Sequence, residues 1–292
     1  MALNEKALLV KLSISRWYNR VTDKKITNEI GRNHGVKTNE DRYIKTLINK
    51  DALTHIDKTL SDIYRFHTNA TMPWQDDGVR ILPSKGYFAY QRGISERHYA
   101  LEDEVRTFVA LYPEWVKHAE NTKGSMFDIA QYPTPEEIKE KYKIHVSILP
   151  FPTTTDFRVE GDAGEDIAEQ LRVNAQQTID TLMANATQSL MDRVLSRVYT
   201  AYTALKDPEA IFKASTLYSL REVSALVEEL NIAEDEQLKD LIKAVRATYL
   251  SPYSVRASGV MRELITNDLR TILEQYQWTP KSDSGSQKPE AK

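Results

Sequence analysis

The chain has 292 residues, of which 41% are hydrophobic and 28% are charged, and this composition excludes a mostly disordered protein. It contains no cysteine, which excludes disulfide frameworks, thiolate metal sites and cysteine nucleophiles. The formal net charge of −3 hides an asymmetry, because residues 1–50 carry 11 Lys and Arg against 5 Asp and Glu, whereas residues 100–170 carry 7 against 15. A chain that is acidic overall can therefore still present a basic face.

The first elements along the chain are a predicted strand and a predicted helix. Apolar and mostly polar side chains alternate from Leu8 to Ile14, which is the period of a strand with one buried face. Asn39 is expected to cap an apolar series that begins at Tyr43, and this series predicts a long or bent helix ending near His67. The N-terminus lacks the apolar core of a signal peptide and no run is long enough to span a bilayer, so we expect a cytoplasmic protein without membrane contact.

Residues 71–99 combine aromatic rings with cations on a segment rich in glycine and proline. The Asp77-Gly78 pair is typical of a hairpin turn. Single-stranded nucleic acid is bound by such a combination, because rings stack on bases and cations neutralise phosphates. This segment therefore predicts a nucleic-acid contact.

The alternative for this segment is a purely structural hairpin. It would pack Trp74 and Phe88 into the core and pair Asp76 or Asp77 with Arg80. The two interpretations differ in which rings face solvent.

Two helices and a second strand are predicted next. Ser95 is expected to cap the first helix and Pro113 to break it. The Thr-Pro-Glu-Glu sequence from Thr134 is a capping box with proline at the first helical position, and it opens a short helix. Residues 142–149 alternate with the period of the first strand, and residues 156–159 are expected to return as a short partner strand.

The C-terminal half is expected to be helical. From residue 164 to residue 205 there is no proline, and apolar residues recur at steps of three and four, which predicts one long amphipathic helix. Such a helix is longer than a compact domain of this size is wide, so we expect it to pack against other helices or a second subunit. Asp207-Pro208 is expected to start the next helix, and two more are predicted around Leu241 and Leu269.

Together these elements predict an α+β fold, with a small mixed or antiparallel sheet and helices in the N-terminal half and a long amphipathic helix and helical bundle in the C-terminal half. The expected sheet consists of residues 8–16, 79–92, 142–149 and 156–159. The expected domains are an α+β domain over residues 1–160, a helical bundle over residues 161–279 and a disordered tail over residues 280–292.

The sequence carries no catalytic or metal-binding signature. Its six histidines are scattered without metal-ligand spacing, and glycine motifs for phosphate loops, dinucleotides and nucleophile elbows are lacking. Residues 31–37 are expected to be a simple basic loop, and the acids of residues 102–104 to lie early in a helix. We therefore expect no enzymatic activity, no metal and no cofactor, and a divalent-metal nuclease is disfavoured for want of converging carboxylates.

Five short motifs lie between residues 70 and 160. They are Met-Pro-Trp-Gln-Asp-Asp-Gly-Val-Arg-Ile-Leu-Pro at 72–83, Tyr-Pro-Glu at 112–114, Tyr-Pro-Thr-Pro-Glu-Glu-Ile at 132–138, Pro-Phe-Pro at 150–152 and Asp-Phe-Arg-Val at 156–159. In these motifs the chain resembles a family of uncharacterised proteins of tailed bacteriophages. The resemblance implies a phage-encoded protein made in the host cytoplasm, and it favours DNA replication, recombination, virion assembly or defence evasion over metabolism.

Our leading hypothesis is a non-enzymatic protein that binds or anneals single-stranded DNA in phage replication or recombination and associates with itself. Its rings would stack on bases and its cations would neutralise phosphates. The predicted contact residues are Arg16, Trp17, Tyr18, Arg20, Arg80, Lys85, Tyr87, Tyr90 and Arg92.

The alternative hypothesis is a structural or interaction protein, either an assembly factor or an inhibitor directed at the host or its defences. It would form oligomers through the long helix of residues 164–205, contact a phage or host protein and bind no nucleic acid.

Overall fold

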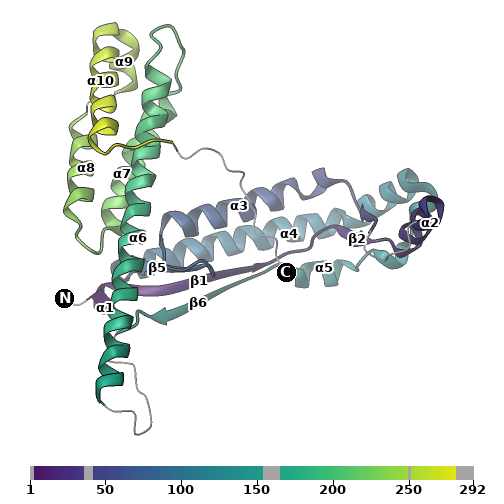
Figure 1. Ribbon diagram of the computed structural model, residues 1–292. Coiled ribbons are helices and arrows are strands. Elements are labelled where there is room, and N and C mark those ends of the chain that lie inside the picture. Colours follow the sequence, from purple (N-terminus) through teal and green to yellow (C-terminus); the bar gives the residue numbers. More distant parts are fainter. Residues whose placement is uncertain (1–2, 36–41, 154–164, 249–250, 281–292) are drawn as a thin grey trace. The chain divides into compact units, whose positions relative to one another are not determined.

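The computed structural model describes residues 3–35, 42–153, 165–248 and 251–280 (Figure 1). The chain forms two compact units. Unit 1 comprises Met1–Val10, Asn69–Tyr87 and Ile148–Lys292, and unit 2 comprises Lys11–Thr68 and Phe88–Ser147. This division does not follow the expected boundary at residue 160, because the segment around the Asp77-Gly78 turn belongs to the same unit as the C-terminal helices.

Four strands form one antiparallel sheet, which together with the helices confirms the α+β class. Their order is β4 (Met72–Pro73), β5 (Val79–Pro83), β1 (Ala7–Ser15) and β6 (Lys143–Pro150), and the arrows of β1 and β6 point in opposite directions in Figure 1. The β4–β5 hairpin places Met72 opposite Ile81, and Gly78 in its turn has a φ of 86°, a conformation that costs glycine little.

The expected sheet needs two corrections. Residues 84–92 are not a strand. The short helix η2 (Ser84–Gly86) follows β5 directly, and α4 (Tyr87–Lys123) begins at the next residue. Residues 156–159 lie outside the described residues. The strands predicted at residues 8–16 and 142–149 are confirmed within one or two residues at each end.

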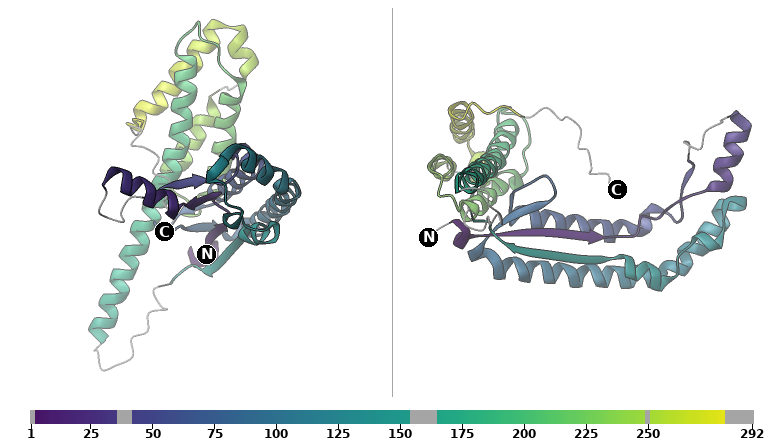
Figure 2. Two further views of the ribbon diagram at one scale, coloured as in Figure 1. Left: turned by 90° about the vertical axis from the view of Figure 1, so that its right-hand side faces the viewer. Right: turned by 60° about the horizontal axis from the view of Figure 1, so that its bottom comes forward.

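Unit 2 consists of a pair of long helices with a smaller two-stranded sheet. The strand β2 (Arg20–Thr22) pairs antiparallel with β3 (Ile44–Thr46), and Val21 lies opposite Lys45. The helices α3 (Thr54–Asn69) and α4 contact each other, since Arg97 Nε of α4 donates to the Asp62 carboxylate of α3 at 2.8 Å, and Figure 2 shows the same unit from two further sides. The remaining elements are α2 (Lys24–His34), η1 (Lys50–Leu53), η3 (Gly124–Met126), η4 (Ile129–Gln131) and α5 (Pro135–Lys141).

Three predictions for unit 2 were wrong at the level of single elements. The helix expected to end near His67 is split, because residues 44–46 pair with β2 and only α3 is helical. The loop expected at residues 31–37 is helical as far as His34. Ser95 caps nothing, since α4 begins eight residues earlier and continues through Pro113, whose side chain faces solvent.

The capping box of α5 is confirmed in both directions. The Thr134 hydroxyl accepts a hydrogen bond from the Glu137 backbone N–H at 3.2 Å, and the Glu137 carboxylate accepts one from the Thr134 backbone N–H at 2.8 Å. These contacts satisfy two N–H groups that the helix end would otherwise leave free. Hydrogen bonding to Thr134 also lowers the pKa of Glu137.

Unit 1 is built around the predicted long helix, α6 (Glu165–Leu205), which is confirmed. It packs along α7 (Ala214–Leu230) and α10 (Gly259–Gln275), with α8 (Glu236–Ala247) beside them. Two short helices, α1 (Leu3–Lys6) and α9 (Pro252–Ala257), complete the described part. The helix expected at Asp207-Pro208 begins later, at Ala214, and residues 281–292 lie outside the described residues.

Candidate nucleic-acid interface

The nine predicted contact residues are divided between the two units. Unit 1 holds Arg80, Lys85 and Tyr87. Unit 2 holds Arg16, Trp17, Tyr18, Arg20, Tyr90 and Arg92.

Two of the predicted stacking rings belong to the core instead, so their assignment needs correction. Trp17 is buried, and its ring centroid lies 6.0 Å from that of Phe108 and 5.9 Å from that of Tyr112. Tyr90 is 2% exposed, and its hydroxyl is 2.8 Å from Nδ1 of His67. Neither ring presents a face to which a base can stack.

The rings of residues 71–99 divide between core and surface. Trp74 is buried against Phe151, at 4.9 Å between ring centroids, as the structural-hairpin alternative predicts. Phe88, which that alternative also placed in the core, is 79% exposed, and Tyr99 is exposed as well. Both exposed rings lie on α4 and not on a strand.

Arg80 is held against the hairpin in unit 1. Its Nε donates to the Thr71 hydroxyl at 2.6 Å, and its Nη2 donates to the Thr71 carbonyl at 3.2 Å. Lys85 is exposed on η2, and Tyr87 is half-buried. These three residues belong to unit 1, and Tyr87 is the first residue of α4, the helix that also carries Tyr90 and Arg92.

A predicted group that does stay together is found at the junction of β1 and β2. Tyr18 is 59% exposed, and the guanidinium carbon of Arg16 lies 5.4 Å from its ring centroid. Arg16 is also 3.3 Å from the Asp57 carboxylate of α3. Arg20 is exposed on β2, two residues beyond Tyr18.

A tyrosine that the sequence did not single out joins this group. Tyr64 of α3 is half-exposed, and its pKa is raised by partial burial and by Tyr18 while Arg16 lowers it. Its place beside Tyr18 follows from the packing of α3, for which the local sequence carries no signal. The group of Arg16, Tyr18 and Tyr64 therefore offers two accessible rings beside one cation.

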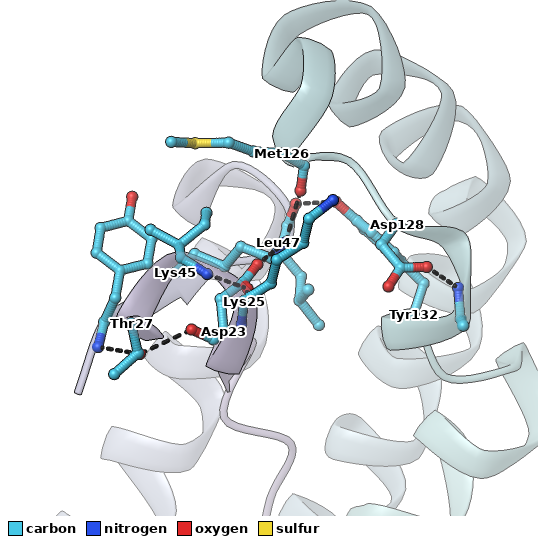
Figure 3. Close-up of polar contacts among 11 residues, drawn as sticks. Asp23, Lys25, Thr27, Lys45, Leu47, Met126, Asp128 and Tyr132 are labelled. Carbon is cyan, nitrogen blue, oxygen red and sulfur yellow. Dashed lines mark hydrogen bonds and ion pairs between the residues drawn. The ribbon is translucent and has the colours of Figure 1, made fainter. Parts of the chain in front are cut away.

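Further along the chain, a buried ion pair fixes the helix α2 on the small sheet (Figure 3). Asp23 caps α2, accepting hydrogen bonds from the backbone N–H groups of Lys25 and Ile26, each at 3.1 Å. Its other carboxylate oxygen is 2.7 Å from Nζ of Lys45, which also donates to the Met126 carbonyl at 2.5 Å. The hydrogen bond from Lys45 is the main cause that lowers the pKa of Asp23.

Backbone contacts complete the attachment of α2. The Asp23 N–H donates to the Tyr43 carbonyl at 2.9 Å, and the Thr27 hydroxyl connects the Tyr43 N–H to the Asp23 carbonyl. On the other side of β3, the Tyr132 hydroxyl donates to the Leu47 carbonyl at 2.8 Å. The end of unit 2 therefore has a defined polar interior, and its remaining charges point outward.

The outward charges are mostly positive. Asp23 is buried and paired, so Glu29 is the only exposed carboxylate in the described residues 16–35 and 42–50. We call the exposed cations of β2, of α2 and of the residues just before β3 the basic surface, and they are Arg20, Lys24, Lys25, Arg32 and Arg42. Four of these five were missed as individual contacts, although the charge excess of residues 1–50 was a signal for them.

Comparison of the chain with models of known families, with curated proteins and with solved structures finds no match. In the part of the chain that the structure describes, no three His, Asp or Glu side chains gather as a metal site would require. Among the described helices, none has both the length and the apolar character needed to cross a bilayer.

Proposed function

We propose that this chain is a non-enzymatic protein that binds single-stranded DNA through the basic surface of unit 2. The observation that carries the proposal is the burial of the Asp23 carboxylate against Lys45, which takes this one negative charge off the exposed surface. Among the described residues 16–35 and 42–50, the five cations of the basic surface then stand against one exposed carboxylate, Glu29. Such a surface neutralises phosphates and releases their counterions, which is the main source of affinity for nucleic acid.

The preference for single strands rests on the neighbouring rings. Tyr18 and Tyr64 are accessible beside Arg16, and a base that is not paired in a duplex can stack on such rings. Stacking on one ring is worth about 1–3 kcal/mol per base, and it tolerates any sequence. The proposal therefore predicts weak sequence preference.

The resemblance to phage proteins supports a setting for this activity. We place it in DNA replication or recombination in the cytoplasm of an infected host, where single strands are exposed and must be protected or annealed.

The proposal is tested by titrating the protein into labelled oligo(dT) and into a duplex of equal length, at several salt concentrations, with fluorescence anisotropy. We expect binding to oligo(dT) to weaken linearly in log–log form as salt rises, with a slope of roughly −0.7 for each phosphate neutralised. Replacing Lys24, Lys25 and Arg32 with alanine is expected to make this slope shallower by about 2.

The matched control removes three exposed cations from unit 1, by replacing Arg197, Lys206 and Lys213 with alanine. This variant loses the same net charge, and we expect it to bind like the wild type. Equal weakening by both variants would show that net charge alone, and not the basic surface, causes the binding.

A further inference from the structure

The helix α6 has an apolar stripe that extends beyond the part covered by other helices. Ile167 is 51% exposed and Leu171, four residues further on the same side of the helix, is 38% exposed. The first buried residue described on α6 is Ile179. The three turns before Ile179 therefore present large apolar side chains to solvent.

The exposed stripe continues a face that is buried further along. Leu171, Ala175 and Ile179 are four residues apart, and the series goes on through Met183 and Ala186 into the core of unit 1. Residues at this spacing lie on one side of a helix. The same side that packs against α7 and α10 is thus left without a partner among the described residues of unit 1.

The charge pattern points to the identity of the missing partner. Residues 173–191 contain one charged residue, Asp180, whereas 28% of the whole chain is charged. The exposed side chains here are mostly amides and hydroxyls, such as Asn174, Gln177 and Thr181. Charged residues are depleted from the centres of interfaces, and an uncharged segment can approach a copy of itself without repulsion.

We propose that residues 167–182 of α6 pack against the same residues of a second copy of this chain, in antiparallel orientation. Glu169 lies near the start of α6, so a parallel pair would place Glu169 of the two copies side by side. An antiparallel pair of residues 167–182 is centred near Ala175 and separates these two carboxylates. This association lies in unit 1 and requires no nucleic acid, so its test does not depend on whether the protein binds DNA.

The contact covers about four turns from each copy, which is small for a permanent dimer. We expect a concentration-dependent equilibrium in the micromolar range, measured by sedimentation equilibrium on the full chain. Leu171→Glu is expected to weaken dimerisation at least tenfold. Ser196→Glu is the matched control, because it adds the same charge at an exposed position of α6 within the covered part. A wild type that stays monomeric at 500 μM, roughly the top of this range, or a Leu171→Glu variant that dimerises like it, would overturn the proposal.

Disulfide cross-linking tests the orientation without relying on a disruptive variant. The chain has no cysteine, so Ala175→Cys and Ala168→Cys each create one thiol on the same face of α6. In an antiparallel pair centred near Ala175, the two positions 175 are adjacent, whereas the two positions 168 are offset by about 21 Å along the axis. We expect mild oxidation to cross-link only Ala175→Cys. Cross-linking of both variants would contradict the antiparallel arrangement, and cross-linking of neither would contradict the contact itself.

Discussion

At the scale of the residue, Tyr18 is the ring on which the proposed preference for single strands depends. It is 59% exposed, and the guanidinium carbon of Arg16 lies 5.4 Å from its ring centroid. Tyr18→Ala is expected to weaken binding to oligo(dT) by about 1–3 kcal/mol without a change in melting temperature. Tyr253→Ala removes an exposed tyrosine ring, 82% accessible, from unit 1 and is expected to have no effect on binding. If Tyr18→Ala lowered the melting temperature and left binding intact, the ring would be structural.

Gly93 is a second residue at which a substitution should have a clear effect, because the ring of Phe66 packs against it. A Cβ at this position would lie 2.2 Å from Cζ of Phe66, and the guanidinium carbon of Arg97 lies 4.1 Å from the centroid of the same ring. Alanine usually stabilises a helix relative to glycine by about 1 kcal/mol. Here we expect Gly93→Ala to destabilise the protein by about 1–3 kcal/mol through overpacking, measured by chemical denaturation.

The control for this substitution is Gly259→Ala at the start of α10, where nothing lies within 4 Å of the added Cβ. That variant is expected to be neutral or slightly stabilising. A Gly93→Ala variant as stable as Gly259→Ala would show that the Phe66 ring moves aside at little cost.

At the scale of the element, the attachment of α2 depends on the Asp23 and Lys45 pair. Lys45→Met leaves the Asp23 carboxylate buried without its cation, and we expect a loss of about 3 kcal/mol in the free energy of unfolding. Because the folded pKa of Asp23 is lowered, the pair stabilises the wild type above the ordinary carboxyl pKa of roughly 3.9. This contribution is lost as the pH falls through the lowered value.

Denaturation curves at pH 7 and pH 3 measure this contribution. The difference in stability between the wild type and Lys45→Met is expected to shrink at the lower pH. Lys239→Met, which breaks an exposed pair with Glu236, is expected to change stability little at either pH. A difference between wild type and Lys45→Met that is independent of pH would assign the effect to packing of the lysine stem.

The elements that the sequence predicts correctly are those in which local signals and packing agree. The capping box at Thr134 fixes the start of α5, and the alternation that follows fixes β6. The apolar steps of residues 164–205 fix α6 in the same way. In each case a short stretch of chain contains all the information needed.

The elements that were predicted wrongly depend on contacts with distant residues. The apolar residues from Tyr43 to Ile48 have helical spacing, but pairing with β2 draws residues 44–46 into a strand. Pro113 was expected to end a helix, yet it faces solvent on α4, where water can satisfy the carbonyl that loses its N–H partner. Local propensity is too weak to decide against such contacts.

The candidate site was predictable only in part for the same reason. The charge excess of residues 1–50 indicated a basic face. The exposed cations of these residues lie on β2, on α2 and just before β3. The burial of Tyr90 was not predictable, because it follows from a helix where a strand was expected. Trp17 was likewise taken for a surface ring, and its burial depends on Phe108 and Tyr112 of α4.

At the scale of the whole molecule, the two proposed contacts belong to different units. Unit 2 would contact DNA through the basic surface, and unit 1 would contact a second copy through α6. Since the two surfaces share no residue, Leu171→Glu is expected to bind a short oligonucleotide like the wild type, and the variant of the basic surface is expected to dimerise like the wild type.

The most direct test of the central claim is the salt dependence of oligo(dT) binding for the wild type and for the variant lacking Lys24, Lys25 and Arg32. We predict that the wild type binds oligo(dT) more tightly than the duplex, and that its log–log slope is steeper than that of the variant by about 2. Binding that is absent at low salt, or a slope that the three substitutions leave unchanged, would contradict the claim that the basic surface binds single-stranded DNA.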